Sequence, residues 1–158
     1  MSSGHVEALR GLLAAQPIAA LGTLHGGAPY VSMTPFATVP GRGFAIHVSG
    51  LAAHTKDMLE NPAVSLLVIQ WPNPAVSPQA AARCTIRGTA RRCGESDPDH
   101  AAARQAYLAR FPDTEPMFGF GDFSLFLIAP EAGRLVGGFA QARSLRGEEV
   151  LEALAATA

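Results

Sequence analysis

Apolar and polar residues alternate along several stretches of the chain with the period of two that is typical of β-strands. The clearest case is 83–92, where one face carries cysteine, isoleucine, glycine and alanine and the other carries arginine and threonine. This pattern predicts a half-exposed strand. Further strands are predicted at 18–24, 28–38, 44–48, 64–69, 123–128 and 134–141.

Glycine and proline mark the turns between these runs. His25-Gly26-Gly27 predicts a hairpin between the first two strands, and Pro35 predicts an edge position or a bulge in the second. The run 64–69 is continuously apolar, so we expect it to be buried on both faces. We expect the last two strands to pair across a turn at 130–133. The proline-rich stretch 71–82 is expected to be a long functional or interface loop.

Helical spacing of apolar residues predicts helices at 6–15, 55–61, 97–111 and 147–157. Asp97 is the expected N-cap of the third, with Pro98 at its first position. His54 or Thr55 is expected to cap the second, with Asp57 in its first turn and Met58 and Leu59 facing inward. The predicted fold class is therefore mainly β with peripheral helices.

Composition narrows the class of protein further. The 158 residues predict a single domain spanning 1–158, and a 48% apolar content is sufficient for a core. Charged residues make up only 16%, which favours a buried subunit interface. A net charge of −1 gives no electrostatic reason to expect nucleic acid or an anionic membrane as a partner. The chain shows no signal peptide and no membrane-length apolar run, so a cytoplasmic protein is expected.

Familiar catalytic and metal motifs are missing from the sequence. No serine stands in a GxSxG motif, and the five histidines have neither HxH nor HExxH spacing. Cys84 and Cys93 are expected to be buried thiols, and His25 a turn residue. No metal site is predicted, and the catalytic residues stay unassigned.

The stretch 44–61 carries the strongest chemical signal. A strand ends at Ser49, and His54, Thr55 and Lys56 open the following helix. Unpaired backbone N–H groups and the helix dipole favour an anion at such a point, so we predict a phosphate site there. The alternative is an ordinary helix start with a solvated lysine.

A cofactor would need a second wall beside this phosphate site. One candidate is the backbone of 30–34, which precedes the site in sequence, and the other is Arg83, placed directly after the proline-rich loop. An arginine there suits a phosphate or carboxylate, although it is equally compatible with an exposed strand position.

Five segments resemble the flavin-binding split-barrel superfamily that includes the pyridoxamine 5′-phosphate oxidases, most closely its branch related to haem-utilisation proteins. They are 19–37, 51–68, 82–92, 103–113 and 119–142. The resemblance covers nearly the whole chain. It implies a six-stranded antiparallel split β-barrel that forms a homodimer with FMN at the interface.

The resemblance also implies roles for individual residues. Those expected to contact FMN are the phosphate-gripping Ser49, Thr55 and Lys56 with His54 beside them, the strand residues Val31, Ser32 and Met33 along the isoalloxazine, and Arg83 at the dimer interface.

Two departures from the family bear on the substrate. The segment 141–150 offers only Arg143 and Arg146 as basic residues, so pyridoxamine phosphate is not carried over as substrate. Haem-degrading relatives use a histidine near the C-terminus as iron ligand, and here no histidine follows His100.

The sequence therefore predicts an FMN-binding flavoprotein, an oxidoreductase acting on an unidentified small molecule. One alternative is a haem-binding or haem-degrading protein that uses the same dimer cleft, with His54 or His47 as the histidines to test. The other is a flavin-binding module without turnover.

Overall fold

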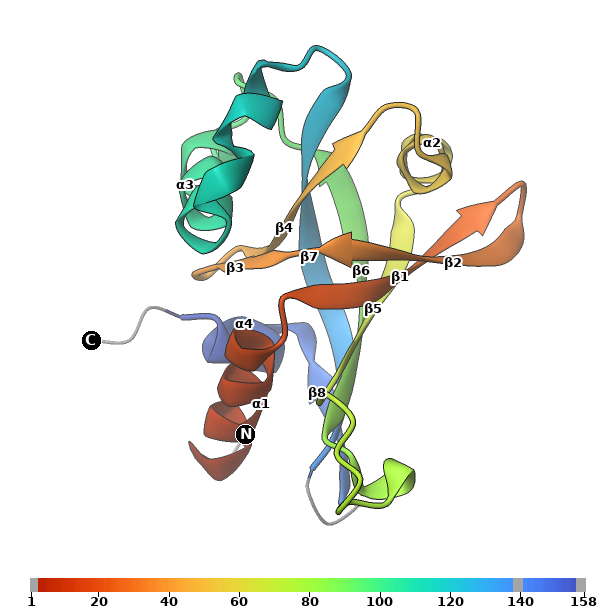
Figure 1. Ribbon diagram of the computed structural model, residues 1–158, viewed down its shortest axis with the longest axis vertical. Helices are drawn as coiled ribbons and strands as arrows, with labels where there is room; N and C mark the ends of the chain where they lie inside the picture. Colours follow the sequence, from red (N-terminus) through yellow and green to blue (C-terminus); the bar gives the residue numbers. More distant parts are fainter. Residues whose placement is uncertain (1–2, 138–140, 156–158) are drawn as a thin grey trace.

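The computed structural model describes residues 3–137 and 141–155. Over these residues eight strands form one antiparallel sheet with helices around it (Figure 1). The strands are β1 Ile18–His25, β2 Ala28–Pro35, β3 Ala37–Val39, β4 Gly43–Ser49, β5 Ala63–Ile69, β6 Arg83–Arg92, β7 Phe123–Val136 and β8 Ala142–Arg146. The helices are α1 Ser3–Ala15, α2 Ala53–Glu60, α3 His100–Arg110 and α4 Gly147–Ala153, with 3₁₀ segments η1 Pro78–Ala80 and η2 Pro112–Gly119. The predicted mainly-β class with peripheral helices is confirmed.

The sheet closes into a split barrel through a break in its second predicted strand. Its order is β2-β1-β5-β6-β7-β4-β3, and the end strands β2 and β3 are separated only by Phe36. Pro35 pairs with Ile18 of β1, whereas Ala37 pairs with Ala45 of β4. The run predicted as one strand at 28–38 thus forms the two end strands of the sheet. The residue after the proline leads the chain from β2 to β3.

β7 corrects the prediction of a hairpin at 130–133. The chain continues as one strand from Phe123 to Val136, and a bulge lies where the β6 register shifts between Arg87 and Gly88. A Cβ on Gly88 would come 2.4 Å from the Ala129 carbonyl oxygen, so only glycine allows this close approach. The real partner strand is β8, which pairs with 132–136. The predicted strand at 134–141 includes residues 138–140, which lie outside the described residues.

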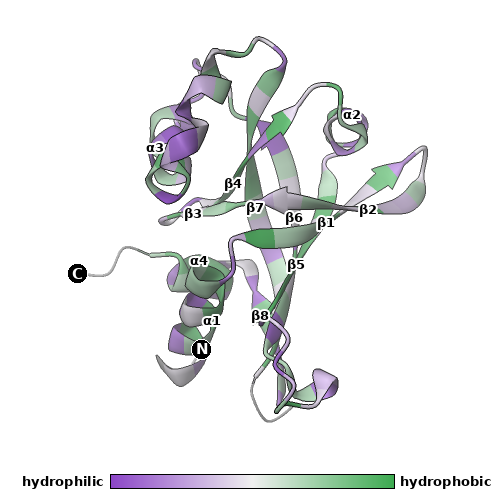
Figure 2. Ribbon diagram, in the orientation of Figure 1, coloured by the Kyte–Doolittle hydropathy of each residue, from purple (hydrophilic) through white to green (hydrophobic). Residues whose placement is uncertain are grey.

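The continuously apolar run at 64–69, which forms β5, was expected to be buried on both faces. The structure shows this burial for β4 instead. β5 alternates, with Val64, Leu66 and Val68 buried and Ser65 and Leu67 only partly covered, so it is not buried on both faces. β4 is the strand buried on both faces, because one side fills the barrel and the other packs against α3. Figure 2 shows the central strands as mostly hydrophobic and α3 as largely hydrophilic on its visible side.

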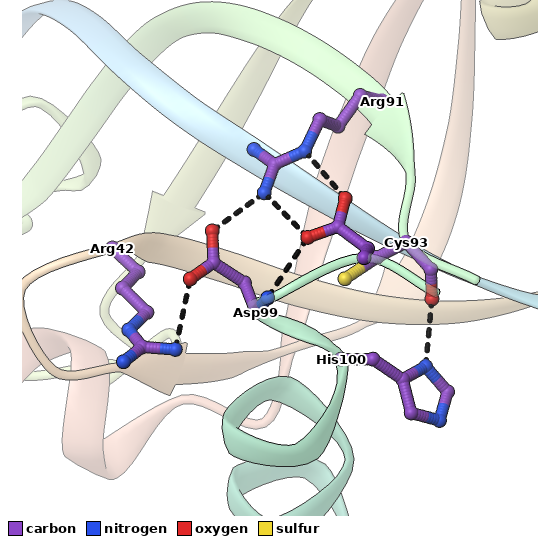
Figure 3. A network of polar contacts seen from close by, with 6 residues as sticks. Arg42, Arg91, Cys93, Asp99 and His100 are labelled. Carbon is purple, nitrogen blue, oxygen red and sulfur yellow. Dashed lines mark hydrogen bonds and ion pairs between the residues drawn. The ribbon is translucent and has the colours of Figure 1, made fainter. Parts of the chain in front are cut away.

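An ion-pair network fixes the start of α3 (Figure 3). Arg91 of β6 donates to both carboxylate oxygens of Asp97, at 2.9 and 3.1 Å, and to Asp99 at 2.6 Å. Arg42, from the turn before β4, contacts Asp99 at 2.8 Å. The N-cap of α3 is therefore Asp99, not Asp97 as predicted, because Asp97 is held outside the helix by Arg91.

The remaining helices cover other parts of the barrel. α1 and α4 lie together, and the Arg10 Nε donates to the Ala153 carbonyl at 3.1 Å. α2 lies beside β1 at the opposite side of the molecule (Figure 1). Within the described ranges no helix is both long and apolar enough to cross a membrane.

Candidate functional site

The predicted phosphate site lies at the start of α2, but its hydroxyl groups are already engaged. The Thr55 Oγ1 donates to the Ser49 carbonyl at 2.6 Å, and the Leu51 N–H donates to the Ser49 Oγ at 3.1 Å. These bonds hold the loop that links β4 to α2. The N-cap is Ala52 and makes no side-chain cap, so the expectation of a His54 or Thr55 cap is wrong.

Lys56 is the exposed cation of this segment. No hydrogen bond or ion pair in the described part of the chain engages its ammonium group. Met58 and Leu59 of α2 were both expected to face inward. Met58 is buried, but Leu59 is exposed, because the other side chain that α2 turns toward the barrel is Asp57. Asp57 lies in the second turn of α2, not the first.

His54 joins α2 to β2. Its Nδ1 lies 2.8 Å from the Ser32 Oγ. Burial lowers the pKa of His54, and the nearby Asp57 charge opposes that shift only in part, so the ring favours its neutral form. Ser32 therefore faces α2, whereas its neighbours Val31 and Met33 point to the opposite, outward face, where they are 70% and 57% exposed.

A second pair in this region was not predicted from the sequence. The buried Asp57 carboxylate accepts a hydrogen bond from the Thr23 Oγ1 at 2.7 Å and contacts the His25 Nδ1 at 2.6 Å. Burial alone raises the pKa of Asp57, but the bonds from Thr23 and His25 outweigh it and leave that pKa below its usual value. Asp57 is thus an ionised buried carboxylate with an imidazole attached.

His25 was expected to be a turn residue without a role. The tight turn that follows it instead holds it in a fixed position. Gly26 and Gly27 form a two-residue connection with φ of +57° and +84°, the left-handed values that such a tight hairpin requires. His25 therefore stays in register as the last residue of β1, with its ring 5.4 Å from the Tyr30 ring. The sequence signal for the pair was a lone aspartate on the inward side of a helix.

Within one chain, Arg83 lies away from the predicted phosphate site at the start of α2. It pairs with Ile69 at the far end of β5, whereas α2 leads into the near end at Ala63. Its Nη1 donates to the carbonyls of Gln79 and Ala81, at 3.0 and 2.9 Å, which anchors the proline-rich loop. Arg83 and the phosphate site are therefore at opposite ends of the strand.

Three hollows line the outward side of β2, β1 and β5 and the loop beyond. One of about 330 Å³ lies over β1 and β5, and its lining includes Gly22, Tyr30, Val31, Ser65, Arg87 and Glu131. A second of about 330 Å³ includes Ile18, Ala20, Met33, Leu67 and Trp71. A third, of about 740 Å³, lies within the proline-rich loop from Ile69 to Arg83.

Apolar side chains are exposed along this outward side. Ile18, Met33 and Ile69 belong to three neighbouring strands, and Trp71 is 72% exposed. Contiguous exposed apolar surface on a folded protein marks a binding or association face.

Two other histidines serve the α3 side of the barrel. His47 is buried, stacked at 3.8 Å on the Phe118 ring, and burial together with the Arg104 charge lowers its pKa to about 4. Among the described residues its Nδ1 has no hydrogen-bond partner. The His100 Nδ1 contacts the Cys93 carbonyl at 2.9 Å.

In the described part of the chain no cluster of three or more His, Cys, Asp or Glu residues is arranged to hold a metal ion.

Comparison with known proteins relates this geometry to a family. The family model described as pyridoxamine 5′-phosphate oxidase matches residues 6–137. The chain is 40% identical over 122 residues to the chloroplastic heme oxygenase HOZ of Arabidopsis thaliana, covering 77% of this chain and 36% of that protein. It is 30% identical over 128 residues to heme oxygenase HutZ of Vibrio cholerae, covering 80% of this chain and 72% of that protein.

The fold has the same relatives. A structure described as a heme binding protein from Mycobacterium smegmatis superposes with a TM-score of 0.83 at 27% identity, covering 96% of this chain and 61% of that one. The chain thus spans only part of the plant and mycobacterial proteins that it matches. It belongs to the pyridoxamine 5′-phosphate oxidase-like superfamily, in the branch related to haem-utilisation proteins.

Proposed function

We propose that the protein binds haem on the outward side of β2, β1 and β5, in a cleft completed by a second copy of the chain. The observation that carries this proposal is the exposed apolar surface at Val31, Met33 and Trp71. Haem is a flat, largely apolar macrocycle whose iron takes an axial protein ligand. The relatives named heme oxygenase and heme binding protein support the same ligand.

The residues present fit this group. Haem iron is held by its macrocycle and needs one axial protein ligand, such as histidine, cysteine, methionine or tyrosine, rather than a cluster of ligands. Arg87 lines the hollow over β1 and β5, so a cation is available there for a propionate. When bound, haem supplies redox and oxygen chemistry, while the protein orients it and excludes water.

The homodimer belongs to the same proposal. Each hollow over the strands is about 330 Å³, at the low end for a ligand site. A second apolar face laid against the first would enclose the macrocycle and cover Ile18, Ile69 and Trp71. Such self-complementary contacts are the usual basis of two-fold dimers.

Hemin titration of the purified protein tests the proposal. We expect a Soret shift that saturates, and light scattering that gives twice the chain mass. Absence of any spectral change would remove haem binding as the function. A saturating shift with a strictly monomeric mass would retain haem binding and remove the shared cleft.

The relatives' names also suggest a reaction, oxidative haem degradation. Ascorbate and dioxygen added to the haem-loaded protein separate degradation from storage. Loss of the Soret band with catalase present indicates degradation, and a stable band indicates a binding protein.

An FMN-dependent oxidoreductase is the second candidate function. The start of α2 favours it, because this end has no side-chain cap and Lys56 has no partner among the described residues. The bond of Thr55 weakens it, since that hydroxyl already donates to the Ser49 carbonyl and would have to exchange partners to reach a phosphate. The Ser49 hydroxyl accepts from the Leu51 N–H and could still donate to one. Flavin absorbance in the purified protein, or a rise in Tm on adding FMN that Lys56→Gln abolishes, would support this candidate.

A further inference from the structure

The proline-rich loop that follows β5 is held in one shape by its own hydrogen bonds. The Gln70 N–H donates to the Ala82 carbonyl at 2.8 Å, and the Ala82 N–H donates to the Gln70 Oε1 at 3.2 Å, so the two ends of the loop are tied together. The Arg83 Nη1 adds bonds to the carbonyls of Gln79 and Ala81, at 3.0 and 2.9 Å. The prolines within the loop restrict its backbone further. A loop that is already ordered loses little further conformational entropy when a ligand binds.

Trp71 is the large side chain that this loop exposes. It is the only tryptophan of the chain and is 72% exposed. It lines both the hollow of about 330 Å³ that includes Met33 and the hollow of about 740 Å³ within the loop, and Ile69, Gln70 and Pro72 also belong to both linings. The two hollows therefore adjoin, with the indole at their junction, and together they are called the Trp71 groove below. An exposed indole on an ordered loop offers a large apolar contact area at a small cost in entropy.

The charge of the Trp71 groove comes from one residue. Among the described residues that line it, Arg83 is the only charged one. Its Nη1 is occupied by the two carbonyl bonds, whereas no described residue accepts a hydrogen bond from its Nε or Nη2. Arg91 uses the same two nitrogens to hold the carboxylate of Asp97, at 2.9 and 3.1 Å. The free edge of Arg83 therefore has the geometry that binds a carboxylate.

The other hollows that contain an arginine also contain an acid. Arg87 shares the hollow over β1 and β5 with Glu131. Arg104 lies in a hollow of about 550 Å³ between α3 and η2, together with Glu95 and Glu115. A neighbouring carboxylate repels an anionic ligand and reduces the attraction that the arginine exerts. The Trp71 groove has no acid among its described lining residues, so it is the better site for a flat apolar molecule that carries carboxylates.

We infer that the proline-rich loop forms one wall of the haem site, with Trp71 packed against the macrocycle and the Nε and Nη2 of Arg83 bound to a propionate. This inference rests on the proposed haem-binding function. It places the ligand toward the loop end of the outward surface of β2, β1 and β5. It also gives Arg83 two roles, because one nitrogen closes the loop and the other two bind the ligand.

Hemin titrations of the wild type, Trp71→Ala, Trp71→Phe and Phe120→Ala test the contact with the macrocycle. We expect Trp71→Ala to weaken hemin binding by about 10-fold and Trp71→Phe by no more than about 3-fold, because phenylalanine keeps an aromatic ring at the position. Phe120→Ala removes an exposed aromatic side chain from the turn before β7, outside the groove, and should keep the wild-type affinity. Both positions are exposed, so all three variants should keep the wild-type Tm.

Hemin and its dimethyl ester together test the contact with a propionate. The ester keeps the iron and the macrocycle but carries no carboxylate. We expect Arg83→Gln to weaken binding of hemin by about 10-fold and binding of the ester by less than about 2-fold, since the charge-assisted bonds are present only with hemin. Arg92→Gln, at the other end of β6, is the matched control and should bind both compounds as the wild type does.

The outcomes separate the inference from the function on which it rests. A wild type whose spectrum does not change with hemin removes both. A wild type that binds hemin, with unchanged affinity in Trp71→Ala and in Arg83→Gln, overturns the inference and leaves haem binding in place. Equal losses for hemin and its ester in Arg83→Gln show that this arginine only holds the loop, which overturns the contact with a propionate.

Discussion

Two polar clusters hold helices to this barrel, and they differ in the kind of cation that each uses. At α3, the carboxylates of Asp97 and Asp99 contact the guanidinium groups of Arg91 and Arg42. At α2, the carboxylate of Asp57 contacts an imidazole, that of His25. Both clusters lower the pKa of an aspartate, that of Asp97 to about 2.

The difference concerns how far each cluster is already satisfied by its own partners. A guanidinium stays charged and spends its donors on its partners, so the α3 network has one state at ordinary pH. An imidazole changes charge near neutrality and keeps a second nitrogen for another ligand. The α2 cluster therefore keeps one imidazole nitrogen for a further partner, and the measurements that follow test whether the two sides of the barrel act independently.

The largest expected effect concerns His47, the buried histidine on the α3 side. Its pKa is about 4 in the folded protein against 6.5 in the unfolded chain. Since the folded value is the lower one, its contribution to stability is fully present above pH 6.5 and is lost as the pH falls toward 4. Between about pH 7 and pH 5 this loss amounts to about 2 kcal/mol. Urea unfolding at both values should show His47→Leu to be less acid-sensitive by that amount.

Haem binding provides the control for His47. If His47 is structural only, His47→Leu keeps the haem spectrum of the wild type. Loss of that spectrum in a folded variant would contradict the division between the two clusters and give the α3 side a share in the ligand site.

Arg91→Ala tests the α3 network itself. The change leaves Asp97 without its bidentate partner and removes one of the two arginines from Asp99. Because Arg91 is 44% exposed, we expect a loss of only about 1–2 kcal/mol in the free energy of unfolding, with unchanged haem affinity. Arg92→Ala, an exposed neighbour on the same strand, is the matched control and should have almost no effect. Equal effects of the two variants would show that the network contributes little.

Several of these features were accessible from the sequence and others were not. The strand 83–92 was predicted with its observed bounds because its alternation is uninterrupted and one face is buried. The hairpin at 130–133 was wrong because Pro130 and Gly133 are turn residues by type, yet here they flank a bulge inside β7. Local pattern does not distinguish a proline at a bulge from one at a turn.

For the candidate site, too, the local features were predicted and the contacts between distant residues were not. His54 and Lys56 were placed correctly near the start of a helix because the end of a strand is a local feature, although the cap itself was assigned to the wrong residue. The pair of His25 and Asp57 spans 32 positions and exists only because the barrel brings β1 beside α2. The outward apolar residues of β5 were assigned to the interior, since a face that a partner would cover has the same composition as a core.

The smallest expected effect comes from Thr23→Val, which removes one donor to Asp57 without changing the shape of the side chain. Thr23 is buried, so its hydroxyl contributes about 1 kcal/mol to the free energy of unfolding. Asp57 keeps its contact with His25, and the imidazole keeps its orientation. Urea unfolding should show this loss for Thr23→Val, while hemin titration should leave the haem affinity within about 3-fold of the wild type, because Thr23 faces α2 and not the outward surface. If Thr23→Val instead cost several kcal/mol, the bonds of Thr23, His25 and Asp57 would not be independent, and the three residues would hold α2 to β1 as one cooperative unit.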